Sequence, residues 1–450
     1  MKRVFAIRLL LILAILSLTA CAAPAAPPPA AQEAPAESGA PAAGSRGTLR
    51  FIGPTGGAVK ALTEDLIPMF EAETGIKVEA TYVAHDALTQ KAMTEFVSGT
   101  PTFDVIQFET SWGGRYSPFL EDLEPFIEVA GDAFAEDDIL AAARNMGIAD
   151  GKTVGLPYRV IGRILHYRTD IFEEVGVEPP QTFDEMREVA QAVTLDTDDD
   201  GEIDVYGFGF LGKQGYGNAY EFGTFLFGSG GAWWNLDTCE ILFNDETAVQ
   251  ALQFYADLRN EYGVMPPEVT TWAWDEWIAG GQTGRYAMTI MHTPYAVPLN
   301  NPEASETAGL WGWADAPGRD TLDQGAPPVG GWLFGIPVAA EQKDVAWEFI
   351  QYMTGKEAQL KSAFNENAPT RRSVFEDADV QAMWPWADVA LRSLERGTPM
   401  YNNSEELEAE SALMVTVSEV LLGEKAPQQA ADEAAEKLKD ILAKSGRCPE

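Results

Sequence analysis

The chain has 450 residues, and its 69 acidic residues against 31 basic ones give a formal net charge of −38. This balance argues against a nucleic-acid binder, which needs a basic face for phosphate, and against docking on anionic lipid through a polybasic surface. Hydrophobic residues make up 46% of the chain and aromatic residues 10%. Such a chain is too apolar to be a disordered acidic protein, and its length predicts two or three folded domains.

The first twenty residues have the layout of a secretory signal: three basic residues precede an unbroken apolar run at 9–16, which is too short to span a bilayer. The following segment, Leu18-Thr19-Ala20-Cys21, resembles the bacterial lipobox, which implies cleavage before Cys21 and a diacylglycerol thioether on its sulfur. An ordinary signal peptide, with Cys21 incidental, is the alternative. We expect a lipoprotein signal peptide at 1–20 and an Ala- and Pro-rich tether at 21–47. The body is then extracytoplasmic and held on the membrane by lipid alone.

From residue 48 onward the pattern alternates between strands and helices. Strands are predicted at 48–52, 76–82, 103–108, 154–158 and 161–167, and helices between the first two strands, after 182, after 244, around 345–353 and from 380 to the end. Thr182 and Glu185 have the spacing of a capping box at the start of one helix. The strand–helix–strand unit at the start implies a parallel sheet and an α/β class.

Two cysteines, Cys239 and Cys448, remain after Cys21. They form neither a close pair nor a Cys-His cluster, so a structural zinc site is not indicated. In an oxidising compartment they can form a disulfide, or they can stay as two free thiols.

An acidic loop follows part of the spacing of a Ca²⁺-binding loop. Acidic residues stand at positions 1, 3, 5, 7 and 9, with Gly201 at position 6, but position 12 is Gly207 rather than a bidentate Glu. The candidate ligands are Asp196, Asp198, Asp200, Glu202 and Asp204. The alternatives are a structural Ca²⁺ ion and a solvated acidic turn.

The sequence selects no enzyme and requires no cofactor. Gly207–Lys213 matches a nucleotide-binding glycine pattern, but no helix pattern begins after Gly212 to hold a pyrophosphate. His85, His166 and His292 are scattered, and no nucleophile elbow occurs. His166 is expected in a packed strand.

Most of the 12 tryptophans lie in loop-like surroundings. Loop aromatics beside polar groups suit a ligand with a flat apolar face and a hydroxylated rim, as a sugar has, although core packing accounts for many of them one by one.

Several segments in order resemble the family 1 extracellular solute-binding proteins of bacterial ABC importers, of the maltose and multiple-sugar type. They are Phe103–Ile106, Gly151–Tyr158, Tyr167–Phe172, Pro179–Glu185, Gly230–Trp233, Gly284–Met288, Gly330–Pro337, Ala346–Ile350 and Ala368–Arg371. The resemblance covers residues 48 to 442 and implies a two-lobed periplasmic-binding-protein fold (type II-like), each lobe a central sheet flanked by helices and hinged at a ligand cleft. It places lobe one at 48–158 plus 327–366 and lobe two at 159–326 plus 367–450.

The same resemblance implies a binding protein rather than an enzyme, a monomer that closes on a mono- or oligosaccharide and delivers it to the transmembrane permease subunits. By matching position, the ligand-binding residues are Thr55, Gly56, Glu109, Thr110, Trp112, Tyr220, Tyr295, Gly331 and Trp332. One departure is that Glu410 stands near the late stacking Trp of the maltose-type proteins. The alternatives are the same fold binding a polyamine or other small solute, and an extracellular carbohydrate-active enzyme.

Overall fold

The computed structural model describes residues 47–56, 61–215, 217–364 and 367–448. The predicted signal peptide, Cys21 and nearly all of the tether lie outside these residues. Within them, no helix combines the length and the apolar character that crossing a membrane requires.

The first sheet has strand order β14-β13-β3-β1-β2, and β6 also pairs with β13. Its strands are β1 (Thr48–Pro54), β2 (Lys77–Val83), β3 (Val105–Glu109), β6 (Leu156–Ile161), β13 (Pro328–Gly335) and β14 (Thr398–Pro399). β1 runs parallel to both β2 and β3, which confirms the predicted strand–helix–strand unit, and β13 runs antiparallel to β3 and β6. The helix between β1 and β2 ends at Gly75, whose φ of 73° is a left-handed conformation that suits glycine.

The second sheet has strand order β12-β7-β11-β8. Its strands are β7 (Arg163–Arg168), β8 (Tyr206–Phe208), β11 (Tyr286–His292) and β12 (Trp311–Ala314). Two small hairpins pair β4 (Ile148–Ala149) with β5 (Lys152–Thr153) and β9 (Trp234–Asn235) with β10 (Glu240–Ile241).

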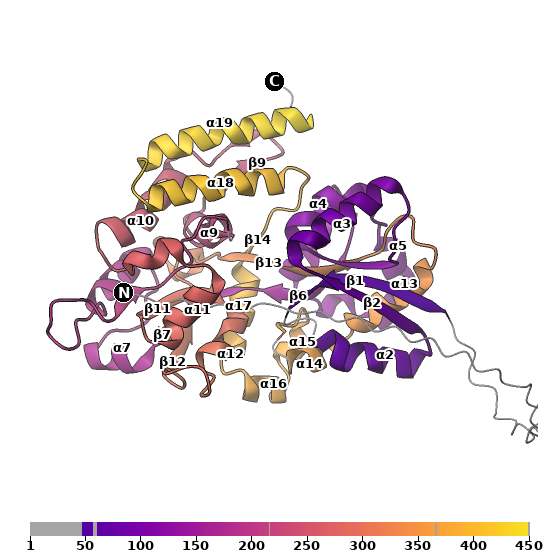
Figure 1. Cartoon of the computed structure of the whole chain (residues 1–450), viewed down its shortest axis with the longest axis horizontal. Coiled ribbons are helices and arrows are strands. Elements are labelled where there is room, and N and C mark those ends of the chain that lie inside the picture. The colour runs from indigo at the N-terminus through magenta and orange to yellow at the C-terminus, as the bar shows by residue number, and fades with distance from the viewer. Residues whose placement is uncertain (1–46, 57–60, 216, 365–366, 449–450) are drawn as a thin grey trace, which may run out of the picture. The chain divides into compact units, whose positions relative to one another are not determined.

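Helices pack around each sheet and enclose a hydrophobic core. We call the first sheet with its helices lobe one, and the second sheet with its helices lobe two. Figure 1 shows α2 and α3 on opposite sides of β1 and β2, and α18 alongside α19. Lobe one has α2 (Ile67–Thr74), α3 (His85–Ser98), α4 (Gly113–Tyr116), α5 (Glu124–Ala130), α6 (Ala141–Asn145), α13 (Lys343–Met353) and α14 (Lys356–Ala363). Lobe two has α7 (Thr169–Val175), α8 (Phe183–Ala192), α9 (Asn218–Gly228), α10 (Glu246–Asn260), α11 (Trp274–Gln282), α18 (Glu406–Leu421) and α19 (Pro427–Ser445), and α12 (Ala296–Leu299) contributes to both cores. The group of α15 (Arg372–Phe375), α16 (Ala378–Met383) and α17 (Ala387–Arg396) contacts both lobes.

Single turns complete the elements: η1 (Ala61–Leu66), η2 (Thr110–Trp112), η3 (Ser117–Phe119), η4 (Gly131–Phe134), η5 (Glu136–Asp138), η6 (Pro267–Thr271), η7 (Thr293–Tyr295) and η8 (Leu322–Gln324). The predicted capping box at the start of α8 is present, because Thr182 accepts a hydrogen bond from the backbone of Glu185 and the Glu185 side chain accepts one from Thr182.

The chain passes between the lobes three times in the described residues. The first crossing lies at Gly162, between β6 and β7, and the second lies between β12 and β13. Both are within a few residues of the predicted boundaries. The third comes before α18, and the preceding helices α15–α17 contact both lobes: Val374 and Phe375 lie in the core of lobe one, whereas α17 packs on β7, where Ser393 Oγ donates to the Arg163 carbonyl. The predicted assignment of residues 367–396 to lobe two stays a prediction.

Candidate functional site

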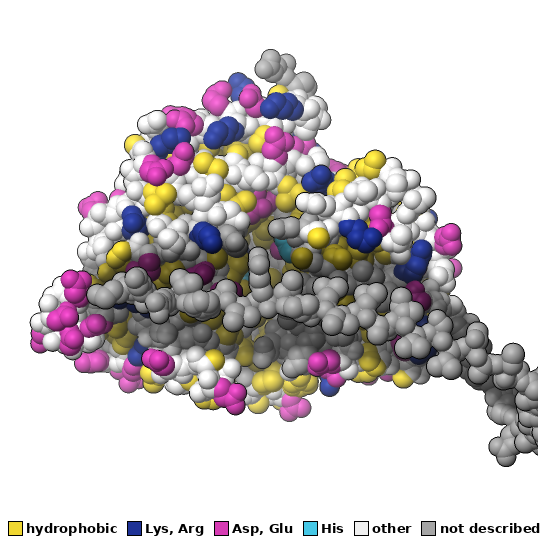
Figure 2. All heavy atoms as spheres, viewed as in Figure 1, with side chains coloured by type: hydrophobic (Ala, Val, Ile, Leu, Met, Phe, Trp, Pro, Cys, Tyr) yellow, Lys and Arg dark blue, Asp and Glu magenta, His cyan; other side chains and the backbone are white. Residues whose placement is uncertain are grey.

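A cavity of about 760 Å³ is lined by residues of both lobes. Figure 2 shows the surface hollowed in this region, with histidine side chains visible inside the hollow. The volume falls in the range of pockets that hold small ligands. Polar and aromatic side chains make up most of the wall, and they come from strands of both sheets, from α3, α9, α11 and α18, and from the turns η2 and η7.

A row of three side chains crosses the sheet of lobe one and faces the cavity. Trp332 on β13 pairs in register with Glu109 on β3 and with Arg159 on β6. Directly paired residues project from the same face of a sheet, and all three line the cavity. The row therefore offers an indole with a carboxylate on one side and a guanidinium on the other.

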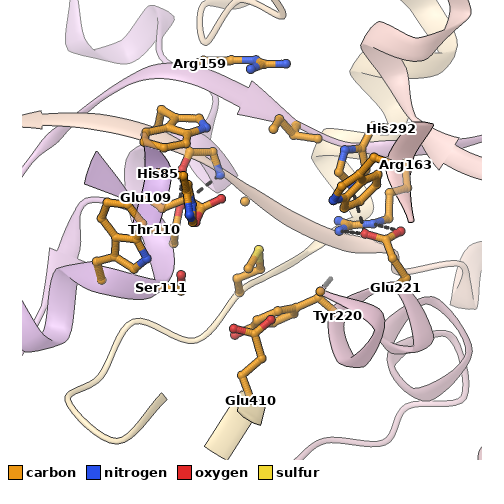
Figure 3. Close-up of a pocket in the computed structure, with 18 of the residues that line it drawn as sticks. His85, Glu109, Thr110, Ser111, Arg159, Arg163, Tyr220, Glu221, His292 and Glu410 are labelled. Carbon is orange, nitrogen blue, oxygen red and sulfur yellow. Dashed lines mark hydrogen bonds and ion pairs between the residues drawn. The ribbon is translucent and has the colours of Figure 1, made fainter. Parts of the chain in front are cut away.

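Aromatic rings hold Trp332 in place. Its ring centroid lies 5.7 Å from that of Trp112 on η2 and 5.9 Å from that of His85 at the start of α3, both edge to face. His85 Nε2 lies 3.0 Å from Glu109 Oε2, which fixes the carboxylate beside the indole. Figure 3 shows His85 and Glu109 together on one side of the cavity.

Thr110 and Gly331 hold the strands together below this row. The Gly331 N–H donates to Thr110 Oγ1 (3.1 Å), which in turn donates to the Gly331 carbonyl (3.2 Å). A Cβ on Gly331 would lie 2.0 Å from the Arg159 carbonyl oxygen, so only glycine lets β13 approach β6 here. Both residues line the cavity, and their hydrogen bonds also join η2 to β13.

Arg159 has no ion-pair partner within bonding distance in the described part of the protein. No hydrogen bond or ion pair is formed by its side chain there, and its Nε is buried without a partner. Burial lowers the pKa of Arg159, although nearby Tyr295 and Glu109 act in the opposite direction. A guanidinium that lines a cavity with its donors unused is placed to bind oxygen atoms of a ligand.

The opposite wall carries a closed ionic network. Arg163, the first residue of β7, binds Glu221 of α9 through Nε (2.9 Å) and Nη2 (2.5 Å), and it donates from Nη1 to the Pro328 carbonyl (2.5 Å). His292 Nε2 lies 3.0 Å from Glu221 Oε1. Burial alone would raise the pKa of Glu221, but the charges of Arg163 and His292 outweigh it and lower that pKa to about 2. Figure 3 shows this group across the cavity from Glu109.

A second aromatic surface adjoins that network. The His292 ring stacks on Tyr295 at a centroid distance of 5.4 Å, and Trp274 at the start of α11 lies 4.7 Å from His292. Aromatic faces therefore line the cavity from both lobes, with Trp332 and Trp112 on one side and Trp274 and Tyr295 on the other.

The start of α18 brings two more carboxyl groups. The Tyr220 hydroxyl donates to Glu406 Oε1 at 2.7 Å, and Glu410, one turn later, lines the cavity. Burial, reinforced by the charge of Glu109, raises the pKa of Glu410 to about 8. Burial and the charge of Glu410 raise the pKa of Glu406 well above its usual value.

Seven of the nine residues predicted to bind ligand line this cavity: Glu109, Thr110, Trp112, Tyr220, Tyr295, Gly331 and Trp332. Thr55 and Gly56 do not; they are exposed at the end of β1. The reason lies in the strand order, because the cavity is built over β3, β13 and β6, whereas β1 lies one strand farther away. A ligand-binding role for the seven residues stays a prediction.

Fifteen lining residues were not predicted from the sequence, among them Trp274 and six titratable residues: His85, Arg159, Arg163, Glu221, His292 and Glu410. Some of the titratable residues could have been found from the sequence, because each is a charged residue within an otherwise apolar segment. Arg159 and Arg163 are the two charged residues of the largely apolar segment 154–165, and Glu221 is the one charged residue of α9, all of which is buried. His166 is fully buried and does not line the cavity, as expected for a packed strand residue, and burial lowers its pKa to about 3.

The remaining predictions fall away from the cavity. Cys239 and Cys448 form a disulfide rather than two free thiols. In the acidic loop, carboxylates of Asp196, Asp198 and Asp204 come within 4.8 Å of one another, whereas Asp200 and Glu202 are not part of this group. Ca²⁺ binding there stays a prediction.

The sequence profile described as bacterial extracellular solute-binding protein matches residues 53–360. The chain therefore belongs to this family, whose members are extracytoplasmic binding proteins. Among the relatives, a mannitol-binding protein of Pseudomonas aeruginosa is 26% identical over 78% of this chain and 79% of its own. A probable amino-acid ABC transporter periplasmic-binding protein of Sinorhizobium fredii is 24% identical over 88% of this chain and 90% of its own.

Among solved structures, that of the maltose-bound MalE3 of T. maritima superposes with a TM-score of 0.76 at 25% identity, covering 88% of this chain and 100% of that one. The predicted two-lobed α/β fold is thereby confirmed.

Proposed function

We propose that the protein is the substrate-binding subunit of an ABC importer and that its ligand is a carbohydrate, captured in the cavity between the lobes. The observation that carries this is the row of Glu109, Trp332 and Arg159. An indole can stack on the apolar face of a sugar ring, while the carboxylate accepts hydrogen bonds from hydroxyl groups and the guanidinium donates to hydroxyl oxygens. The mannitol and maltose in the names of the similar proteins support the same class.

Binding and release follow from the two lobes. A ligand that touches Trp332 on lobe one and Trp274 or Tyr295 on lobe two favours the closed arrangement, because only there does it contact both walls. The three crossings are the places where backbone rotation can occur. The closed form is what the permease subunits receive, and the protein binds its ligand without converting it.

The first test compares two tryptophans of equal exposure. Trp332 and Trp347 are both 9% exposed, but Trp347 on α13 packs between Phe126 and Phe134 in the core of lobe one. Trp332→Ala should weaken sugar binding by ~1 kcal/mol or more, about fivefold in Kd. Trp347→Ala should leave Kd unchanged. Both should lower the melting temperature, because each removes a buried ring. Calorimetric titration and thermal unfolding give both readouts, and equal Kd values for the two variants contradict the stacking role.

We propose further that the protein is a monomer tethered by lipid on Cys21, with the acidic body held off the membrane by residues 21–47. Acyl chains gain about 0.8 kcal/mol per buried CH₂, so several together anchor a soluble body. Cys21→Ser should move the protein from the membrane fraction of expressing cells to the soluble fraction and abolish incorporation of labelled fatty acid. Cys239→Ser is the matched control and should stay in the membrane fraction.

A further inference from the structure

Two carboxyl groups at the start of α18 form no ion pair with any described residue. Glu406 and Glu410 are four residues apart and therefore lie on one face of the helix. Glu406 is fully buried, with one oxygen bonded by Tyr220 and the other, Oε2, without a partner in the described structure. Glu410 lines the cavity in front of it, and in the described part of the chain no side chain bonds to it.

The other two carboxylates that line the cavity, Glu221 and Glu109, each have a bonded partner. Glu221 is bound by Arg163, and Glu109 is bound by the His85 ring. No Lys, Arg or His of the described ranges comes within 4.0 Å of Glu406 or Glu410. Arg159, the free guanidinium, lies on the far side of the cavity from Glu410 in Figure 3.

The charges around Glu410 are mostly of its own sign. The groups that act on it are Glu109 on β3 and Glu221 on α9, with Glu406 one turn before it on α18, against His85 on α3. Ionised carboxylates in such a place favour a positive group, and burial strengthens the preference because water screens less. The aromatic faces of Trp332 and Trp274 add attraction for a cation as well as for a sugar ring.

We propose, on the basis of the proposed carbohydrate binding, that the ligand is an amino sugar whose protonated amine lies at Glu410. The sugar ring stacks on Trp332, and its hydroxyl groups form hydrogen bonds with Arg159 and Glu109. The ammonium group is the positive partner of the Glu410 carboxylate on α18. A polyamine would pair with the carboxylates but has no hydroxyl groups for the Glu109–Trp332–Arg159 row. A neutral sugar would bind to that row but has no cation for Glu410.

The test is a panel of amino-deoxy hexoses, each measured beside its N-acetyl form and its hydroxyl parent. Titration calorimetry on ligand-stripped protein at pH 7 should show at least one amine binding ~10-fold or more tighter than both uncharged forms. In Glu410→Gln this ratio should fall toward one. Glu408→Gln, an exposed residue of the same helix, is the matched control and should keep the ratio.

A second readout follows the proton. Free Glu410 holds a proton at pH 7 because its pKa is raised to about 8, and an ammonium group beside it favours the ionised form. Amine binding should therefore release a proton, measured as a dependence of the binding heat on the ionisation heat of the buffer. The release should disappear in Glu410→Gln, while Glu109, Glu221, His85 and Glu406 remain in place.

The outcomes separate the two proposals. If neutral sugars bind as tightly as the amines, or if Glu410→Gln keeps the ratio, the amino-sugar assignment is overturned while carbohydrate binding stands. If no sugar binds and a polyamine such as spermidine does, both fail.

Discussion

Arg159 and Arg163 are four residues apart in the sequence and have opposite surroundings. The Arg163 guanidinium is 4% exposed and is bonded to Glu221 and to a backbone carbonyl, whereas Arg159 has no bonded partner among the described residues. An ion pair that loses one member leaves a buried charge uncompensated, and an unpaired guanidinium costs stability by its own burial. The same residue type is therefore bonded into the fold at one position and has donors available for a ligand at the other.

Methionine at each position tests this contrast. Arg163→Met should lower the free energy of unfolding by about 3–5 kcal/mol, because it strands the Glu221 carboxylate. Arg159→Met should leave that free energy equal or higher and weaken ligand binding by about 10-fold or more. Urea unfolding and calorimetric titration measure the two quantities. A stability loss at Arg159 as large as that at Arg163 would show that Arg159 is a structural residue.

The elements show what the sequence could predict. The parallel unit of β1, α2 and β2 and the capping box of α8 were correct, because alternation, an apolar stripe and a capping residue are local signals. The lobe to which α15–α17 belong is not a local signal of this kind, since these helices contact both lobes. Periodicity identifies the buried face of a helix such as α17 but not the sheet that covers it, and that choice depends on contacts far away in the sequence.

Part of the candidate site was likewise predictable from the sequence, and part was not. Positions matched to motifs, such as Trp332 and Glu109, reached the cavity, whereas Thr55 missed it because the order of strands in space is not written in their order along the chain. The carboxyl group of Glu410 faces the cavity from α18, whose approach to lobe one is a tertiary contact that no local pattern shows.

The disulfide joins two elements of lobe two. Cys448 follows α19, and Cys239 lies in the turn between β9 and β10, 209 residues earlier. A bond that closes so long a loop restricts the unfolded chain, and removal of such bonds typically costs about 2–4 kcal/mol. Reduction should therefore lower the melting temperature. Cys239→Ser and Cys448→Ser should each reproduce this drop, and the double variant should add nothing to either. An unchanged melting temperature after confirmed reduction contradicts a stabilising bond.

At the scale of the whole molecule, net charge and site charge are separate properties. The formal charge of −38 excluded partners such as nucleic acid, but the cavity contains two arginines, one of them free for a ligand. The ligand class follows from the cavity and from the two lobes that share it, since each lobe supplies one aromatic wall. The central claim is therefore that a carbohydrate binds between the lobes.

Isothermal titration calorimetry tests that claim most directly, on protein unfolded and refolded to remove any bound solute. The panel contains neutral sugars, polyols, amino sugars, polyamines and amino acids. The account predicts that at least one carbohydrate binds with one site per chain and that Trp332→Ala weakens this binding, while polyamines and amino acids give no heat of binding. Saturable binding of a polyamine or an amino acid, with no heat from any carbohydrate, would contradict it.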